Sequence, residues 1–255
     1  REHDLIIGTF GRAAWVLDDI RPLRAIAKDQ SILVSDIILF DPPVAYQAAY
    51  QQPTGSRFGG DALFNGENRD YGAQFKYYFQ KKKTDEVALE INDGEAEEDV
   101  ENSKDKKEAS KDSIYLKIFD GSRLIRTLKK KIPDSTGIYS WKWNMNEAGP
   151  ERPSRKIRAR KNEPGGTTVK PGDYKVTIEH DGQLSSTNIT VESDPRLVVS
   201  QKAINERYSS SKRIEGMLQT AADAVKQLVE SKTIAKDFSS KMRKEDKEQY
   251  KEEIK

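Results

Sequence analysis

The sequence predicts a mainly β protein, an antiparallel sandwich of short strands with helices at its C-terminal end. Segments between residues 71 and 194 alternate apolar and polar side chains with a period of two, which is typical of half-buried strands. Turn signals such as Asp120-Gly121 and Asp181-Gly182 lie between such segments. After Pro195 the apolar residues recur at intervals of three and four, which indicates amphipathic helices. Seven short strands with turn signals indicate a sandwich.

The clearest strand alternates Phe75 and Tyr77 with Gln74 and Lys76. A charge-rich stretch, residues 95–112, contains almost no apolar residues, and we expect it to be a mobile insertion within the sandwich. The predicted strands lie at residues 73–79, 87–91, 114–118, 124–128, 138–143, 174–178 and 186–191.

The N-terminal region, residues 1–25, is predicted to form a β-hairpin. Two short β-prone runs, residues 4–9 and 13–18, flank a glycine turn at Phe10-Gly11-Arg12. Because a two-stranded hairpin is marginally stable in water, these strands need a larger sheet, which the rest of the chain does not obviously provide. Residues 26–70 predict an irregular connector with proline and glycine breaks.

The C-terminal region, residues 195–255, is predicted to form a hairpin of two helices, with the break between the helices at Ser231-Lys232-Thr233. Its first helix carries an apolar stripe with heptad-like spacing. Such a stripe is buried either within the chain or against another subunit, so the stripe is a candidate partner-helix face. The stripe is Ile214, Leu218, Ala221, Val225 and Leu228, and the second helix would use Ile234, Phe238, Met242, Tyr250 and Ile254.

The composition excludes several kinds of chemistry. The 44 Lys and Arg residues nearly balance the 42 Asp and Glu residues, so overall basicity gives no argument for nucleic-acid binding. The lack of cysteine excludes disulfides, zinc–thiolate sites and thiol nucleophiles. Two histidines exclude most histidine-rich metal sites, and no apolar run approaches the roughly 20 residues of a membrane helix. We predict no cofactor.

No motif predicts a catalytic site in this chain. Residues 8–12 contain two glycines after a strand, but they lack the spacing of a dinucleotide or phosphate loop, and a hairpin turn explains them. The aspartates in turns are most simply capping and turn residues. These aspartates are Asp18, Asp19, Asp36, Asp41 and Asp61.

Two groups of residues are candidates for ligand or partner contact. Tyr139, Trp141 and Trp143 share one face of a predicted strand, where they form either an aromatic platform for sugars or peptides or part of the sandwich core. Because a buried tryptophan is common in such cores, the second interpretation is favoured. A basic loop would contact phosphate or an acidic partner, or is simply solvated, and the lack of interleaved aromatics favours the second interpretation. That loop contains Arg152, Arg155, Lys156, Arg158, Arg160 and Lys161.

The opening segment, Asp4 to Asp19, resembles the last blade of sortilin-type, BNR-repeat β-propellers of secreted bacterial proteins, which are often labelled glycosyl-hydrolase-like. Gly137 to Met145 resembles that family's glycine-led Trp-Asp strand. Pro171 to Val176 is similar to its Pro-Gly-x-Tyr strand, which flagellar hook-capping immunoglobulin-like domains also have. The chain departs from the family at Phe10, where histidine is common, and at Asn144, where aspartate is frequent. No Asp-box occurs in the chain.

The resemblance implies the order propeller, connector, immunoglobulin-like sandwich and helical segment. It implies a non-catalytic accessory module of a secreted, periplasmic or cell-surface bacterial protein. We expect the module to dock on the β-propeller portion of the same protein or of a partner chain, and on other subunits through its helices. The alternatives are the C-terminal part of a glycan hydrolase whose active site lies in the propeller, or a carbohydrate-binding module that uses Trp141 or Trp143. The first residue is not Met, so we expect a piece of a longer or processed protein.

Overall fold

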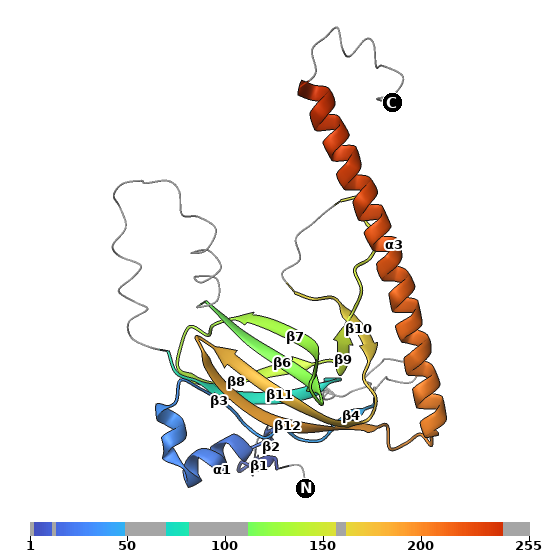
Figure 1. The fold of residues 1–255 in the computed structure, drawn as a ribbon. Coiled ribbons are helices and arrows are strands. Elements are labelled where there is room, and N and C mark those ends of the chain that lie inside the picture. Colours follow the sequence, from blue (N-terminus) through green and yellow to red (C-terminus); the bar gives the residue numbers. More distant parts are fainter. Residues whose placement is uncertain (1–2, 12–13, 49–69, 82–111, 157–161, 242–255) are drawn as a thin grey trace, which may run out of the picture. The chain divides into compact units, whose positions relative to one another are not determined.

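The computed structural model describes residues 3–11, 14–48, 70–81, 112–156 and 162–241 (Figure 1). The described chain is mainly β, as the sequence predicts, and it ends in one long helix. It forms two compact units: the first contains residues 1–147 and 168–200, and the second contains residues 148–167 and 201–255. This division differs from the predicted boundary at residue 195, because residues 148–167 belong with the helix.

The first unit contains a five-stranded sheet in the order β4-β12-β11-β6-β7. β11 pairs antiparallel with β12 and with β6, and β6 pairs antiparallel with β7. The edge strand β4 is the exception, because it runs parallel to β12 with Ala45 opposite Val191. The bounds are β4 Ala45–Gln47, β6 Ser113–Asp120, β7 Arg123–Lys131, β11 Gly172–His180 and β12 Gln183–Ser193.

The first unit also contains a three-stranded antiparallel sheet in the order β3-β5-β8. Its central strand β5 places Phe75 opposite Trp141 of β8 and Tyr78 opposite Ile38 of β3. A separate two-stranded sheet pairs β9 with β10. The bounds are β3 Ile37–Leu39, β5 Ala73–Phe79, β8 Gly137–Trp143, β9 Asn146–Ala148 and β10 Gly165–Thr168.

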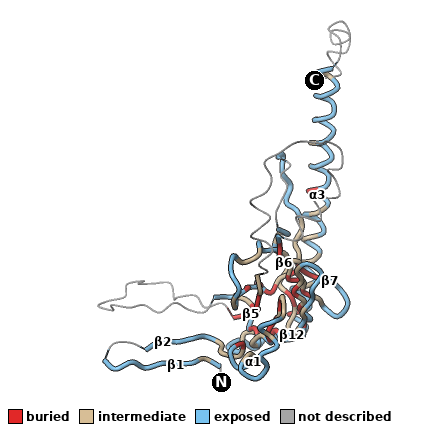
Figure 2. The backbone as a smooth tube through the Cα atoms, turned by 90° about the vertical axis from the view of Figure 1, so that its left-hand side faces the viewer, coloured by how far each residue is buried: buried red, intermediate tan, exposed pale blue. Residues whose placement is uncertain are grey.

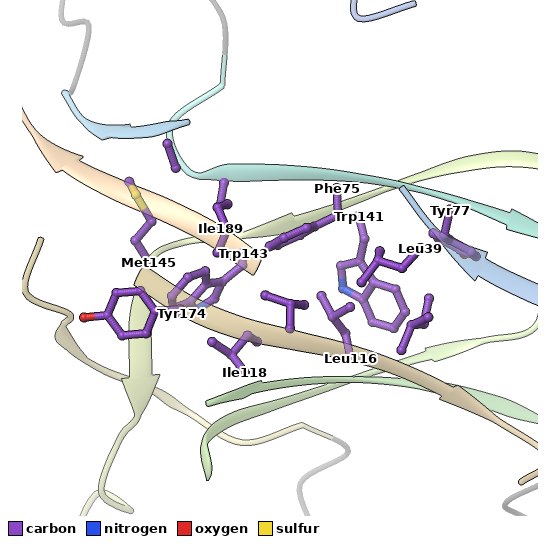
Figure 3. Close-up of a cluster of buried hydrophobic side chains, with 14 of the residues drawn as sticks. Leu39, Phe75, Tyr77, Leu116, Ile118, Trp141, Trp143, Met145, Tyr174 and Ile189 are labelled. Carbon is purple, nitrogen blue, oxygen red and sulfur yellow. The ribbon is translucent and has the colours of Figure 1, made fainter. Parts of the chain in front are cut away.

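The five-stranded and three-stranded sheets share one hydrophobic core. Buried residues gather in the strands of these sheets (Figure 2), and the close-up shows their side chains converging from both sheets (Figure 3). The period-two alternation produces this core, since every second side chain of a strand points to the same face. Core residues with 0% exposure are Ala73, Phe75, Ile114, Leu116, Ile118, Trp143, Met145, Val176 and Ile178.

Six of the seven predicted strands are confirmed; β5 has the predicted bounds, and the other five differ from them by one to three residues at one or both ends. The seventh, residues 87–91, lies outside the described residues, as does all but the last residue of the stretch 95–112. The expected irregular connector contains regular elements instead. The helix α1 (Arg21–Lys28) runs into it, and the 3₁₀ helix η1 (Gln30–Val34), β3 and β4 follow. These three-residue strands are too short to show a period. Pairing with longer neighbours and burial of Ile37, Leu39 and Ala45 in the core stabilise them.

The described part of the C-terminal region contains one helix, α3 (Gln201–Lys241), and the predicted break at residues 231–233 is wrong. Serine and threonine reduce helix stability by only about 0.5 kcal/mol each, so they do not stop a helix. Thr233 Oγ1 also donates to the carbonyl oxygen of Val229 at 2.8 Å, which satisfies the hydroxyl within the helix. Met242, Tyr250 and Ile254 lie outside the described residues. Among the helices described, none combines the length and hydropathy of a membrane span.

Candidate functional site

The N-terminal hairpin, β1 (Leu5–Gly8) with β2 (Ala14–Leu17), is an exposed apolar feature of the first unit. Its strands pair antiparallel with each other, with Ile7 opposite Trp15 and Ile6 opposite Val16. Within the described part of the chain, neither strand pairs with any other strand. All eight strand residues are exposed, as the pale tube of β1 and β2 shows (Figure 2). The predicted hairpin therefore forms, and we call these eight residues the ribbon.

The ribbon is apolar on both faces. Residues that are directly opposite in an antiparallel pair share a face, and successive residues alternate between faces. One face carries larger side chains and the other smaller ones, and neither carries a charged or polar side chain. Phe10, in the connecting turn, is fully exposed. The first face is Leu5, Ile7, Trp15 and Leu17, and the second is Ile6, Gly8, Ala14 and Val16.

Polar residues fix the root of the ribbon to the three-stranded sheet. The backbone N–H of Asp19 donates to Asp4 Oδ1 at 2.9 Å, and the N–H of Ile20 donates to the carbonyl oxygen of His3 at 2.8 Å. The ammonium group of Lys76, on β5, donates to the carbonyl oxygens of Asp18 and Asp19. Because β5 is the central strand of its sheet, these bonds hold the root on a rigid support.

Two of the turn aspartates, Asp19 and Asp41, have structural roles in the described chain. Asp19 accepts a hydrogen bond from Arg21 Nε at 2.5 Å and adopts a positive φ of 55°, which bends the chain between β2 and α1. Asp41 Oδ1 accepts a hydrogen bond from Thr187 Oγ1 at 2.6 Å. Asp61 lies outside the described residues. Among the residues that are described, no group of three or more acidic or histidine side chains is placed to hold a metal ion.

Trp141 and Trp143 lie in the core rather than on an aromatic platform. Trp143 is completely buried, its Nε1 donates to the carbonyl oxygen of Asn146 at 2.8 Å, and its ring lies 5.7 Å from that of Tyr174. Trp141 is 3% exposed, and Lys130 Nζ lies 5.1 Å from its ring centroid. Burial lowers the pKa of Lys130. Neither indole therefore offers a face on which a sugar ring can stack.

Tyr139 closes the edge of the same aromatic group. It is half-buried, its hydroxyl donates to the carbonyl oxygen of Ser135 at 2.6 Å, and its ring lies 5.9 Å from that of Tyr77. Burial, with a smaller contribution from Tyr139, raises the pKa of Tyr77 to about 12. The interpretation of these aromatics as core residues is thus the one that the geometry favours.

The predicted partner-helix face lies on α3 in the second unit. Ile214, Leu218, Ala221 and Leu228 are exposed, and Val225 is half-buried. In this unit α3 contacts residues 148–167 through polar side chains on an adjacent face. There, the N–H of Thr167 donates to the Glu215 carboxylate, and the N–H of Glu151 donates to Gln219 Oε1 at 2.9 Å. The described residues therefore leave most of the apolar stripe uncovered.

The basic loop is only partly described. Arg152, Arg155 and Lys156 are exposed, whereas Arg158, Arg160 and Lys161 lie outside the described residues. The exposure of the first three side chains fits a solvated loop.

Trp15 and the apolar residues on both faces of the ribbon were not singled out from the sequence as a site, although a signal for them exists. Leu5-Ile6-Ile7 and Trp15-Val16-Leu17 are continuous apolar runs with no period-two alternation, which is typical of strands that are buried on both faces. No family model, curated protein or solved structure matches this chain.

Proposed function

We propose that this chain is a non-catalytic accessory module that docks through the ribbon on the β-propeller portion of the same protein or of a partner chain. The observation that carries the proposal is the ribbon itself, a regular pair of strands whose apolar faces are exposed in the described chain. The resemblance of residues 4–19 to the last blade of secreted bacterial propellers suggests the partner and a secreted, periplasmic or cell-surface location.

The physical chemistry of the ribbon supports docking. Burial of a large aliphatic or aromatic side chain contributes roughly 1.5–3 kcal/mol, and the ribbon together with Phe10 exposes seven such side chains. A two-stranded ribbon in water is marginal, so a covering partner would stabilise it. Contiguous apolar surface of this kind is typical of interaction sites.

We propose an immunoglobulin/hook-capping-like sandwich as the fold of the sheets in the first unit. Two sheets sharing one core support this assignment. The Tyr174 hydroxyl also donates to the carbonyl oxygen of Lys170 at 2.6 Å, which is similar to the tyrosine corner of immunoglobulin-like domains. Such a rigid body would hold the ribbon at its root in a constant orientation.

The proposal is tested by the intact mass and partner content of the protein purified from its native source. We expect a species heavier than 28.9 kDa that contains a propeller, identified by sequencing its peptides. The variant Ile7→Lys places a charge on the ribbon. If the propeller belongs to a separate chain, this variant should no longer co-purify with it. Leu184→Lys is the matched control, because Leu184 is also an exposed aliphatic residue but lies on β12. A lone 28.9 kDa chain would overturn the proposal.

A further inference from the structure

We propose that the partner encloses the ribbon on both faces and hydrogen-bonds to one of its outer edges, so that the ribbon becomes part of an inner sheet of a layered β-sheet assembly. This inference rests on the proposed docking function and specifies its geometry. It differs from docking in a groove, in which one face of the ribbon is covered and the other stays in water.

The distribution of apolar side chains favours enclosure. On one face Ile7 is 47% and Trp15 66% exposed. On the other face Ile6 is 69% and Val16 59% exposed, so the second face exposes as much of its large side chains as the first. A strand with one face in water carries polar residues on that face, as β11 does with Lys175, Thr177 and Glu179. The ribbon has no such face.

The edges of the ribbon decide the kind of partner. The backbone groups that point outward from β1 and β2 have no strand partner within the described chain. Insertion into lipid would remove water from these N–H and C=O groups without replacing their hydrogen bonds, which is strongly unfavourable. A protein strand supplies those bonds while its neighbours cover the faces. The chemistry of the ribbon therefore fits β-sheets of a protein better than a membrane.

The root of the ribbon shows where enclosure ends. Asp4, Asp18 and Asp19 adjoin the strands, and Lys76 binds the backbone at this point. Charged side chains at the root remain in water most favourably at the rim of an interface. Enclosure should thus extend from the turn at Phe10 to the last strand residues, Leu5 and Leu17.

The absence of cysteine from the chain allows a direct test with single-cysteine variants of the full chain. Ile7→Cys reports on one face and Val16→Cys on the other, at adjacent positions along the ribbon. Val198→Cys is the control, because Val198 is fully exposed and lies far from the ribbon in sequence. Each variant is labelled with a maleimide, both as the purified chain and in the material isolated from the native source.

We expect all three thiols to react at comparable rates in the purified chain. In the native material, labelling of both ribbon thiols should slow on the order of tenfold or more, while the control is unchanged. Protection of only one ribbon thiol, with a propeller present, would overturn the enclosure and leave the docking function intact. Two unprotected ribbon thiols in a chain without a partner would overturn the docking function itself. Protection of the purified chain by vesicles of equal parts phosphatidylcholine and phosphatidylglycerol would identify a lipid site and also overturn the inference.

Discussion

The guanidinium of Arg123 donates two hydrogen bonds to the carboxylate of Glu147, at 2.8 Å from Nη2 to Oε1 and at 3.1 Å from Nη1 to Oε2. The Glu147 side chain is only 5% exposed, whereas that of Arg123 is half exposed. Arg126 Nη1 donates to the backbone carbonyl oxygen of Glu147 at 3.2 Å. These bonds attach β9 to β7, and they keep a buried carboxylate neutralised.

Removal of the paired cation should therefore destabilise the first unit. Arg123→Leu leaves the Glu147 carboxylate without its bidentate partner, and we expect the free energy of unfolding to fall by about 2 kcal/mol. Urea denaturation measures this change. Asp120→Asn is the control, because Asp120 pairs with Arg123 at the surface and its loss should change stability by less than about 1 kcal/mol. Equal losses in the two variants would contradict the role of burial.

The pKa of Tyr77 predicts a loss of stability in alkali. Burial raises this pKa from 10.0 to about 12, so between these values the folded state retains a proton that the unfolded state has released. Stability contributed by the neutral phenol is complete below pH 10 and falls as the pH rises toward 12. At pH 11 the loss should be about 1.4 kcal/mol.

Tyr77→Phe removes this titration, so its unfolding free energy should decrease less between pH 9 and pH 11 than that of the wild type. Tyr46→Phe, which changes an exposed tyrosine on β4, should follow the wild type. If Tyr77→Phe also follows the wild type, Tyr77 is not the buried titrating group.

Two glycines of the second unit should respond in opposite ways to alanine. A Cβ on Gly149 would lie 2.5 Å from the carbonyl oxygen of Gly165, so Gly149→Ala should break the hydrogen bond from Gly149 N–H to Pro164. A Cβ on Gly216 meets nothing within 4 Å, and alanine there should stabilise α3 by about 0.8–1 kcal/mol.

Amide hydrogen exchange separates the two effects. Exchange of the Gly149-region amides should be faster on the order of tenfold in Gly149→Ala, and exchange in α3 should be slower in Gly216→Ala. Unchanged exchange around Gly149 would show that the backbone there relaxes without cost.

The tryptophans should differ in their access to a fluorescence quencher. Of the three, Trp15 is 66% exposed, whereas Trp141 and Trp143 are buried. In the purified chain, iodide should quench the emission of Trp15 and leave that of the other two largely unaffected. Trp15→Phe should remove most of the quenchable fraction. Strong quenching in that variant would place Trp141 or Trp143 at the surface and restore the carbohydrate-binding alternative.

The apolar stripe of α3 should tolerate charge in the purified chain. Leu228 is 70% exposed, so we expect Leu228→Glu to change the free energy of unfolding by less than about 0.5 kcal/mol. Ala222→Glu is the contrasting variant, because it buries a charge at a position that is 5% exposed and should cost about 2 kcal/mol or more. A large cost for Leu228→Glu would mean that the chain itself covers the stripe.

Strand and helix patterns were predictable where a local rule operates. The alternation in Ala73–Phe79 corresponds to a strand that buries Ala73, Phe75, Tyr77 and Phe79 on one face, because the period of a strand is a property of its backbone. Tyr78, on the other face, is buried as well, which the alternation does not predict. The hairpin was predictable from its glycine turn. The helix was predictable from its spacing, but not its continuity through Thr233, because weak propensities do not determine where a helix ends.

The candidate site was less predictable, because exposure depends on residues that are distant in sequence. Trp15 and Trp143 are chemically identical, yet one is exposed and the other is completely buried. Trp143 is buried because Ala73 of β5 lies opposite it and Tyr174 of β11 packs against its ring, and no local pattern shows that these strands meet.

The sequence by itself determined the predominance of β structure, the positions of the long strands, the hairpin turn and the C-terminal helix. Each of these follows from interactions between residues that are close along the chain. Only the tertiary structure decided that β4 runs parallel to β12, that Trp141 and Trp143 face the core, and that the ribbon exposes both of its apolar faces. Those outcomes depend on which strands pair across long stretches of chain. The free energy of such pairing comes from the burial of apolar side chains between segments that are distant in sequence, so no single segment determines it.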